Sequence, residues 1–331
     1  MNNSTPNREN ARPLISVVAP FYNEELVIDQ FFQQVIGVLE TMGTEWEIVC
    51  VDDGSRDRTL DRLLAAARVN PAIKVLQLSR NFGKEAALTA GLEASRGDVV
   101  VLIDADLQDP PTLISQMLDK WREGFDVVYG VRQSRDQDSL GKRITAGGFY
   151  RIFNQLAPTP LPANVGDFRL MDRRVVDRVR ELPERTRFMK GLFAWVGFKS
   201  TAVAYDRPGR EAGQSAWSYW KLWNFALDGL TSFSTMPLRV WTYVGLIVSL
   251  LAFLYASFLI LRTLVAGVDL PGYASLMVVI LFLGGIQLIS LGVIGEYLGR
   301  VFIEVKQRPV YLVDRVYQFP AGEPEPRDGQ A

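Results

Sequence analysis

The chain of 331 residues is long enough for one large domain and a smaller part, and its 36 basic residues nearly balance 37 acidic residues. This balance gives no overall attraction to nucleic acid, so we expect no nucleic-acid partner. The sequence has no histidine and a single cysteine, which excludes imidazole catalysis, histidine metal ligands and a disulfide framework.

Residues 1–12 are polar and lack an apolar run, which predicts a disordered tail rather than a signal peptide. Short apolar runs then alternate with amphipathic stretches. The apolar runs predict strands at residues 14–19, 46–51, 73–78, 99–103 and 126–131. The stretches between them predict helices at residues 24–41, 57–68, 84–95 and 112–122. This alternation is typical of an α/β fold with a mostly parallel sheet, whose ligands bind beyond the carboxyl ends of the strands.

The pattern loosens between residues 136 and 205. Basic stretches at 142–154 and 173–181, and the stretch 188–196, predict helices, and residues 200–205 predict a further strand. We interpret this region as the second part of the same domain.

The composition changes sharply near residue 237. Residues 241–261 and 270–295 contain no charged residue, and about 20 apolar residues are enough for a helix to cross a bilayer. The short link between them predicts a transmembrane hairpin. Basic residues flank the hairpin at Arg239, Arg300, Lys306, Arg308 and Arg315. Because positive flanks stay cytoplasmic, we expect a multi-pass protein of the inner membrane with both termini and the preceding domain in the cytoplasm.

Residues 216–234 combine many aromatic and aliphatic side chains with few charges. This composition predicts amphipathic helices lying in the headgroup region among membrane lipids, and a helix packed on the preceding domain is the alternative. Gly295 and Gly299 have a G-x-x-x-G spacing, which serves packing within the hairpin as well as contact between copies. A homo-oligomer is therefore left open.

Two carboxylates, Asp104 and Asp106, directly follow the strand predicted at 99–103. They can converge on one cation, and hard oxygen ligands suit Mg²⁺ or Mn²⁺. Such an ion would bridge a diphosphate and neutralise charge on a leaving group. Asp109 precedes two prolines, so we favour a helix cap at that position.

Polar residues also follow the first two strands. Asp52 and Asp53 follow the second strand, where a carboxylate can accept a hydrogen bond from a base or a ribose, or cap the next helix. Tyr22 and Glu24 follow the first strand, where they can lie against a base, although a turn and a helix start explain part of this pattern.

Four motifs occur along the chain in the order Pro20-x-Tyr22-Asn23-Glu24, Asp52-Asp53-Gly54-Ser55, Ser79-Arg80-Asn81-Phe82-Gly83-Lys84 and Asp104-x-Asp106-Leu107-Gln108-Asp109-Pro110. Together they resemble the GT-A fold of glycosyltransferase family 2, in particular its polyprenyl-phosphate sugar synthases, such as the dolichol-phosphate mannose synthases. Residues 166–171 and 232–239 resemble the bacterial bactoprenol (undecaprenyl phosphate) glucosyltransferases, which also end in two transmembrane helices.

The resemblance implies the roles of the donor-site residues. It assigns the nucleoside to Pro20, Tyr22, Glu24, Asp52 and Asp53. It assigns the metal ion, Mg²⁺ or Mn²⁺, and the diphosphate to Asp104, Asp106 and Gln108, with Ala105 between them. Lys84 is implied to reach a donor phosphate, as is an arginine on a glycine-rich loop, where Arg210 is favoured over Arg207. The start of the helix at Lys84 would also attract anions through its free N–H groups.

The acceptor phosphate needs cations of its own. Arg132, Lys142 and Arg143 are candidates, because a guanidinium fork matches phosphate geometry, and a solvated basic face is the alternative. Asp167 is implied to be a base. However, a phosphate monoester has its second pKa near 6 and has largely lost its proton at neutral pH. Asp167 is therefore either a base or an orienting residue.

The expected reaction is an inverting, metal-dependent transfer of a sugar from a nucleotide diphosphate to polyprenyl phosphate. UDP-glucose is favoured by resemblance alone, and GDP-mannose, UDP-N-acetylglucosamine and an aminoarabinose donor remain open. A non-catalytic scaffold that binds nucleotide sugars is a rival from another class. A processive polysaccharide synthase would add a Q-x-x-R-W segment and more spans, and dinucleotide or P-loop motifs are also missing from the sequence.

The expected organisation has five parts. A tail (1–12) precedes a cytosolic GT-A domain (13–215) and interfacial amphipathic helices (216–236). A transmembrane hairpin (237–300, with spans at about 239–264 and 271–297) and a cytosolic C-terminal tail (301–331) follow.

Overall fold

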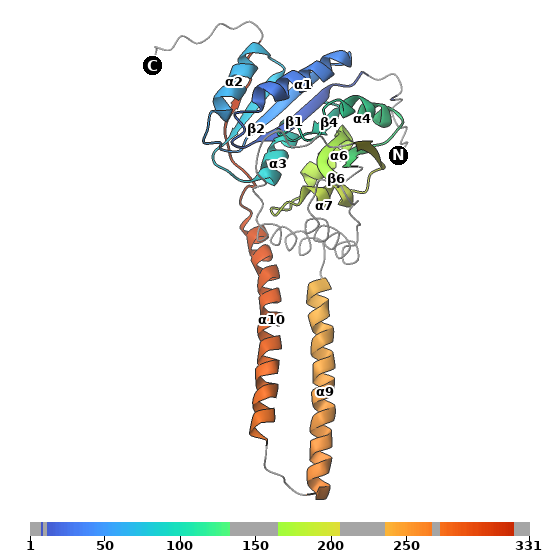
Figure 1. The fold of residues 1–331 in the computed structure, drawn as a ribbon, viewed down its shortest axis with the longest axis vertical. Helices are drawn as coiled ribbons and strands as arrows, with labels where there is room; N and C mark the ends of the chain where they lie inside the picture. Colours follow the sequence, from blue (N-terminus) through green and yellow to red (C-terminus); the bar gives the residue numbers. More distant parts are fainter. Residues whose placement is uncertain (1–7, 9–11, 133–164, 206–235, 267–271, 321–331) are drawn as a thin grey trace. The chain divides into compact units, whose positions relative to one another are not determined.

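The computed structural model describes residues 8, 12–132, 165–205, 236–266 and 272–320 (Figure 1). The chain divides into two compact units. The first comprises Met1–Asn154, Thr159–Ser218 and Pro309–Ala331, and the second comprises Gln155–Pro158 and Tyr219–Arg308. The helices predicted at 142–154 and 216–234 lie outside the described residues.

A twisted β-sheet forms the centre of the first unit. Its strands are β1 (Ile15–Phe21), β2 (Trp46–Asp52), β3 (Ile73–Leu78), β4 (Val99–Leu102), β5 (Val127–Arg132), β6 (Val165–Asp172), β7 (Ser200–Tyr205) and β8 (Val313–Tyr317). Their order across the sheet is β7-β5-β6-β4-β1-β2-β3-β8. The strands β6 and β8 run antiparallel to their neighbours, and the others share one direction. The predicted α/β fold with a mostly parallel sheet is confirmed.

Helices cover both faces of this sheet (Figure 1). They are α1 (Ile28–Thr41), α2 (Thr59–Val69), α3 (Lys84–Ala94), α4 (Leu113–Arg122), α6 (Arg173–Glu181) and α7 (Met189–Trp195). Buried side chains of α1, α2 and α4 belong to one apolar cluster with alternate residues of the strands. On the opposite face, α3 brings Gly91 against Val18 and Val51. The sheet is therefore buried on both sides, which explains the nearly continuous apolar strands.

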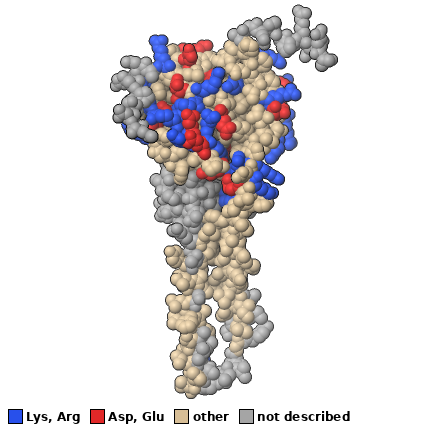
Figure 2. All heavy atoms as spheres, turned by 180° about the vertical axis from the view of Figure 1, so that it is seen from behind, with Lys and Arg blue, Asp and Glu red and all other residues tan. Residues whose placement is uncertain are grey.

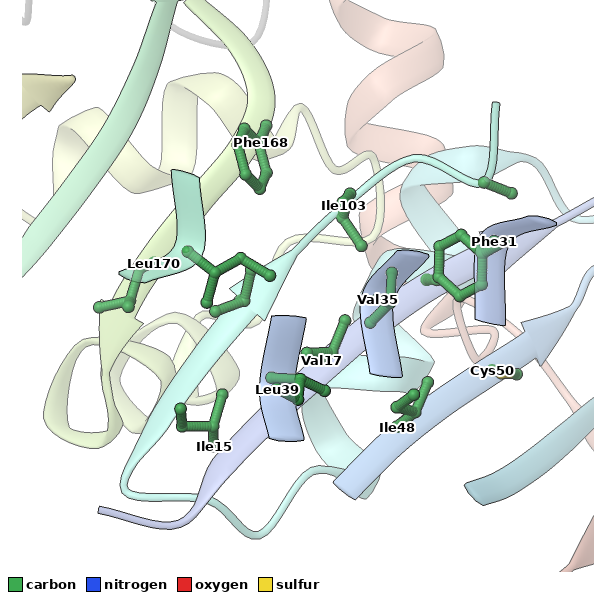
Figure 3. Close-up of a cluster of buried hydrophobic side chains, with 14 of the residues drawn as sticks. Ile15, Val17, Phe31, Val35, Leu39, Ile48, Cys50, Ile103, Phe168 and Leu170 are labelled. Carbon is green, nitrogen blue, oxygen red and sulfur yellow. The ribbon is translucent and has the colours of Figure 1, made fainter. Parts of the chain in front are cut away.

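In the core, the apolar face of helix α1 packs against the apolar face of strand β1 (Figure 3). Phe31, Val35 and Leu39 recur every four residues, so they line one face of α1. Ile15 and Val17 alternate along β1, so both point to the face that α1 covers. All five side chains are fully buried, and each contributes roughly 1.5–3 kcal/mol by leaving water.

Two strands of the first unit were not predicted from the sequence. Val165–Asp172 forms β6, which inserts between β4 and β5, and Val313–Tyr317 forms β8, which extends the sheet beyond β3. Arg8 lies in the segment predicted as a tail, yet its side chain is buried beside Trp121, Asp126 and Asp172. Both ends of the chain thus contribute to this unit.

The second unit contains two long helices, α9 (Met236–Ala266) and α10 (Tyr273–Lys306), which contact each other. The apolar side chains of these helices that the structure describes are largely exposed, and Figure 2 shows few charged residues on the face of these helices in view. Within the described residues, Phe282–Lys306 is long and apolar enough to cross a membrane, with a mean hydropathy of 1.4. Tyr243–Tyr255 is a shorter apolar stretch.

Candidate active site

The candidate site lies at the edge of the sheet where the parallel strands end. Because β6 is antiparallel, it begins at the edge where β4 ends, and Leu102 pairs with Arg169. This pairing places Asp167, near the start of β6, beside Asp104, which follows β4. The topology therefore brings together two carboxylates that are far apart in the sequence.

A lysine joins these two carboxylates. Lys84 is the first residue of α3, and its Nζ lies 2.6 Å from Asp104 Oδ1 and 2.8 Å from Asp104 Oδ2. The same Nζ lies 2.5 Å from Asp167 Oδ2. Lys190 of α7 approaches the other oxygen of Asp167, at 3.9 Å. The cluster therefore holds two carboxylates and two ammonium groups at the edge of the sheet.

The electrostatics of this cluster follow from its burial and pairing. Burial alone would lower the pKa of Lys84, but the carboxylates of Asp167 and Asp104 raise it above its usual value. Burial raises the pKa of Asp104, and Lys84 partly offsets this shift. For Asp167 the ammonium groups of Lys190 and Lys84 outweigh burial and hold its pKa well below the usual range. Asp167 is therefore a weak proton acceptor.

The predicted metal ligands lie on a tight turn after β4. Gln108 N donates to Asp106 Oδ1 at 3.2 Å, and Leu107 adopts a left-handed conformation with φ of 53°. Ala105 is buried, whereas Asp106 is exposed. Gln108 is also buried, and its Oε1 has no hydrogen-bond partner within the described part of the protein. The turn thus offers an unused amide oxygen beside two carboxylates.

These donors fit a metal ion that is held mainly by a diphosphate. Mg²⁺ in such sites takes one or two protein carboxylates and completes its shell with phosphate oxygens and water. Across the residues that the structure describes, no three His, Cys, Asp or Glu side chains form a metal cage. Asp104, Asp106 and Gln108 therefore match a site in which phosphate oxygens and water complete the metal shell, and not a closed site made by protein ligands alone.

Asp53 positions a neighbouring loop. Its Oδ1 accepts from Phe82 N at 2.7 Å and its Oδ2 accepts from Gly83 N at 2.9 Å. These bonds fix the loop that leads directly into Lys84. Asp52 is buried as well and accepts from Ser55 N at 3.2 Å. The structure thus places both residues at the predicted edge, with Asp53 turned toward the loop before α3.

Gly54 explains how this loop comes so close. It has a φ of +66°, and a Cβ at this position would lie 2.5 Å from the backbone carbon of Arg80. Only glycine allows both the left-handed backbone and this approach. The Asp52-Asp53-Gly54-Ser55 motif therefore holds the loop after β3 against the loop after β2.

The residues after β1 form the next side of the site. Asn23 has a left-handed φ of 55°, and its Oδ1 accepts from Arg56 N at 2.8 Å. Tyr22 is exposed at 42%, and Pro20 is half-buried. Burial raises the pKa of Glu24, and the carboxylates of Asp106, Asp57 and Asp104 raise it further. The edge is therefore strongly acidic between the ends of β1 and β4.

Asp109 has a different role from the helix cap favoured by the sequence. It is buried, and its Oδ1 accepts a hydrogen bond from the hydroxyl of Tyr205. Tyr205 also bonds to the side chain of Arg132, its cross-strand partner, and burial together with Asp109 raises the pKa of Tyr205 to about 12. This Asp109–Tyr205–Arg132 contact links the turn after β4 to the ends of β5 and β7. Sequence spacing gives no signal for it, because the three residues come from three segments.

Arg169 is a second residue that the sequence did not single out. Its side chain is buried, with Nη2 donating to Gly166 O at 2.9 Å and Nε donating to Asp167 O at 3.2 Å. The guanidinium lies 4.2 Å above the ring of Phe193, and burial lowers its pKa to about 10. It shapes the backbone that presents Asp167. Of the remaining predicted residues, Lys142, Arg143 and Arg210 lie outside the described residues.

Comparisons with known proteins show the family of this chain. Residues 16–180 match the Glycosyl transferase family 2 family, and residues 236–301 match the GtrB C-terminal hairpin. An uncharacterized glycosyltransferase of Synechocystis sp. is 58% identical over 92% of this chain and 95% of its own length. The prophage-derived bactoprenol glucosyl transferase of Shigella flexneri is 49% identical over 92% of this chain and 98% of its own.

Among solved structures, the glucosyl-3-phosphoglycerate synthase of Mycobacterium tuberculosis in complex with UDP has a TM-score of 0.44. It is 21% identical and covers 68% of this chain and 80% of its own. The sequence relatives match nearly the full length of the chain at high identity. The chain therefore belongs to glycosyltransferase family 2, carries the GtrB C-terminal hairpin, and is a glycosyltransferase.

Proposed function

We propose that this protein transfers a sugar from a nucleoside diphosphate to polyprenyl phosphate at the cytoplasmic leaflet, with glucose from UDP-glucose and undecaprenyl phosphate as the favoured pair. The observation that carries the proposal is the approach of Asp104 and Asp167 to one lysine at the strand edge, next to Asp106 and Gln108. This arrangement suits a diphosphate and its metal ion on one side and an acceptor phosphate on the other. Relatives named bactoprenol glucosyl transferase support the acceptor class.

Mg²⁺ or Mn²⁺ would be held by Asp104, Asp106 and Gln108. The unused Oε1 of Gln108 and the mutual repulsion among Glu24, Asp104 and Asp106 favour a divalent cation there. When bound, the ion would neutralise charge on the diphosphate leaving group. Tyr22 would stack on the base and Glu24 would accept from the nucleoside, with Pro20, Asp52 and Asp53 shaping the wall of that subsite.

The chain's own contribution to the reaction is mainly positioning. The acceptor phosphate is largely dianionic at neutral pH, so the attack on the anomeric carbon needs no base. Asp167 is paired with Lys84 and Lys190, which favours its ionised form and a role in orienting cations. Held in line on opposite sides of the sugar, acceptor and leaving group would exchange with inversion of configuration.

The acceptor phosphate would bind at the end of β5. Arg132 ends that strand and is braced by the contact with Tyr205. Lys142 and Arg143 follow in the sequence and would add cations, as would Arg210 for the donor phosphates. The apolar helices of the GtrB-type hairpin would keep the protein in the lipid that carries the polyprenyl chain, in the multi-pass inner-membrane topology expected above.

A panel of donors tests the proposal and names the sugar. Purified full-length protein in lipid receives undecaprenyl phosphate and one of UDP-glucose, UDP-N-acetylglucosamine, GDP-mannose or an aminoarabinose donor, with Mg²⁺ or with EDTA. We expect metal-dependent product from UDP-glucose in the lipid extract. Product from another donor would correct the sugar. No product from any donor, with nucleotide binding intact, would favour the non-catalytic scaffold.

A further inference from the structure

Lys84 occupies a position that bears directly on metal binding. It follows Gly83, whose backbone is fixed by Asp53, and it opens α3. Its ammonium contacts both oxygens of Asp104, at 2.6 and 2.8 Å. The lysine side chain is flexible, so this contact is one of several positions that the ammonium can take.

The ammonium and a metal ion compete for the same oxygens. Mg²⁺ binds carboxylate oxygens at about 2.0–2.1 Å and needs lone pairs that point at the ion. In the observed arrangement Lys84 Nζ contacts both oxygens of Asp104, so it takes the place of an ion bound by both of them, and its charge repels a second cation. With Lys84 in this position, Asp104 is therefore a poor ligand for a metal ion.

A second anchor holds the ammonium at this position. Asp167 Oδ2 lies 2.5 Å from Lys84 Nζ, so the ammonium is shared between two carboxylates. Paired twice, it has little tendency to leave for water. If it leaves, Asp167 retains Lys190 at 3.9 Å and does not become an isolated charge.

We propose that Lys84 closes Asp104 to the metal ion until a nucleoside diphosphate binds, so that the metal and the donor enter as a pair. The inference rests on the proposed function and specifies how that site is loaded. A diphosphate supplies several anionic oxygens that a lysine binds as a point charge. Lys84 also opens α3, and the positive end of a helix dipole favours anions. Transfer of the ammonium from Asp104 to the phosphates frees both Asp104 oxygens for the ion.

Metal affinity without nucleotide tests this step directly. Mn²⁺ binding to full-length protein in detergent is measured by the electron paramagnetic resonance signal of free Mn²⁺, with and without UDP. The Mn²⁺ binding that remains in Asp106→Asn is treated as non-specific and is subtracted from the binding of each other variant. The variants are Lys84→Met and Lys84→Gln, which remove the charge, and Lys84→Arg, which keeps it. Lys190→Met is the matched control, because it removes the other ammonium group of the cluster, which approaches Asp167.

In the wild type we expect weak Mn²⁺ binding that UDP tightens strongly. Lys84→Met and Lys84→Gln should bind Mn²⁺ without nucleotide about five- to tenfold more tightly, as expected for losing a partly exposed ion pair and a nearby like charge. The gain from UDP should shrink correspondingly. Lys84→Arg should behave like the wild type, and Lys190→Met should change the nucleotide-free affinity less than about twofold.

Three results would overturn the inference. The first is wild-type Mn²⁺ binding that is equally tight with and without UDP. The second is an unchanged nucleotide-free affinity in both neutral Lys84 variants. The third is an equal gain in Lys190→Met, which would show a general effect of charge rather than a specific block at Asp104. If no variant binds Mn²⁺ even with UDP, metal dependence fails as well, and the proposed function loses its metal.

Discussion

The hydroxyl of Tyr205, the last residue of β7, donates a hydrogen bond to Asp109, which ends the turn that carries the predicted metal ligands. A Cβ on Gly130 would lie 2.9 Å from the Tyr205 ring, so the aromatic side chain is tightly confined. The bond therefore fixes the turn after β4 against the end of the edge strand β7. Because Asp109 is buried, bulk water cannot donate to it in place of the Tyr205 hydroxyl.

Tyr205→Phe should destabilise the protein by about 1–3 kcal/mol, because a buried carboxylate loses a hydrogen-bond donor. Tyr317→Phe is the matched control. It removes a hydroxyl that donates to the neutral amide of Gln77 at 3.1 Å, and it should cost about 0.5–1.5 kcal/mol. Thermal unfolding followed by intrinsic fluorescence checks the difference. A larger loss for Tyr317→Phe would contradict the account of Asp109.

Gly91→Ala should be strongly unfavourable for packing. A Cβ on Gly91 would lie 2.2 Å from Val18 Cγ1, so α3 or β1 has to shift, at a cost of about 1–3 kcal/mol. Gly37→Ala provides the control within another helix, because nothing lies within 4 Å of a Cβ there. That change should stabilise the protein by about 0.5–1 kcal/mol through the helix preference of alanine. Melting temperatures that move in the same direction would refute this description of the α3 contact.

Arg8→Gln should unfold more easily than the wild type. The buried guanidinium lies 2.6 Å from Asp172 Oδ2 and 3.0 Å from Asp126 Oδ1. Its loss leaves these carboxylates with Arg174 as their remaining cation among the described residues. We expect a loss of about 3 kcal/mol, near the lower end for breaking a buried ion pair, because Arg174 still pairs with both carboxylates. Arg12→Gln, at an exposed position, should change stability by less than about 0.5 kcal/mol. Equal unfolding curves for the two variants would show that Arg8 is not anchored in solution.

Glu85 should make stability depend on pH. Burial and the charge of Asp167 raise its pKa to about 7, although Met189 N, Lys84 and Lys190 act in the opposite direction. Because the folded pKa exceeds the unfolded value of 4.5, its contribution is fully present below pH 4.5 and is lost as the pH rises through about 7.

Glu85→Gln removes this titration and keeps an oxygen that can accept from Met189 N. The difference in melting temperature between the variant and the wild type should therefore grow in favour of the variant from pH 5 to pH 8. Glu181→Gln, on the exposed end of α6, should leave the wild-type pH dependence unchanged. A constant difference between Glu85→Gln and wild type over this range would show that Glu85 titrates normally.

Strands and helices with strong local patterns were predictable from the sequence. β3, β7 and α6 match their predicted ranges, and the other predicted strands agree within two residues at each end. These strands are continuous apolar runs, as burial on both faces requires. Because ligands of parallel sheets bind beyond the carboxyl ends of the strands, the strand ends alone also placed Asp52, Asp104 and Asp106 at one edge.

Features that depend on long-range pairing were not predictable. β6 contains Asp167 and Arg169, and β8 contains Asp314 and Arg315, so neither has a clean apolar or alternating pattern. They are strands because β4, β5 and β3 supply hydrogen-bond partners. The sharing of Lys84 between two carboxylates depends on the same pairing, and the sequence alone suggested only that this lysine reaches a phosphate.

The central claim, sugar transfer that depends on the turn after β4, is tested most directly by one comparison. Radiolabelled glucose from UDP-glucose is followed into lipid-extractable undecaprenyl product for wild type, Asp106→Asn and Asp119→Asn, a surface control on α4. We expect Asp106→Asn to lose about 10²–10³-fold in rate, as for removal of one electrostatic stabiliser of a transition state, and Asp119→Asn to match the wild type. Equal rates for Asp106→Asn and wild type would contradict the account.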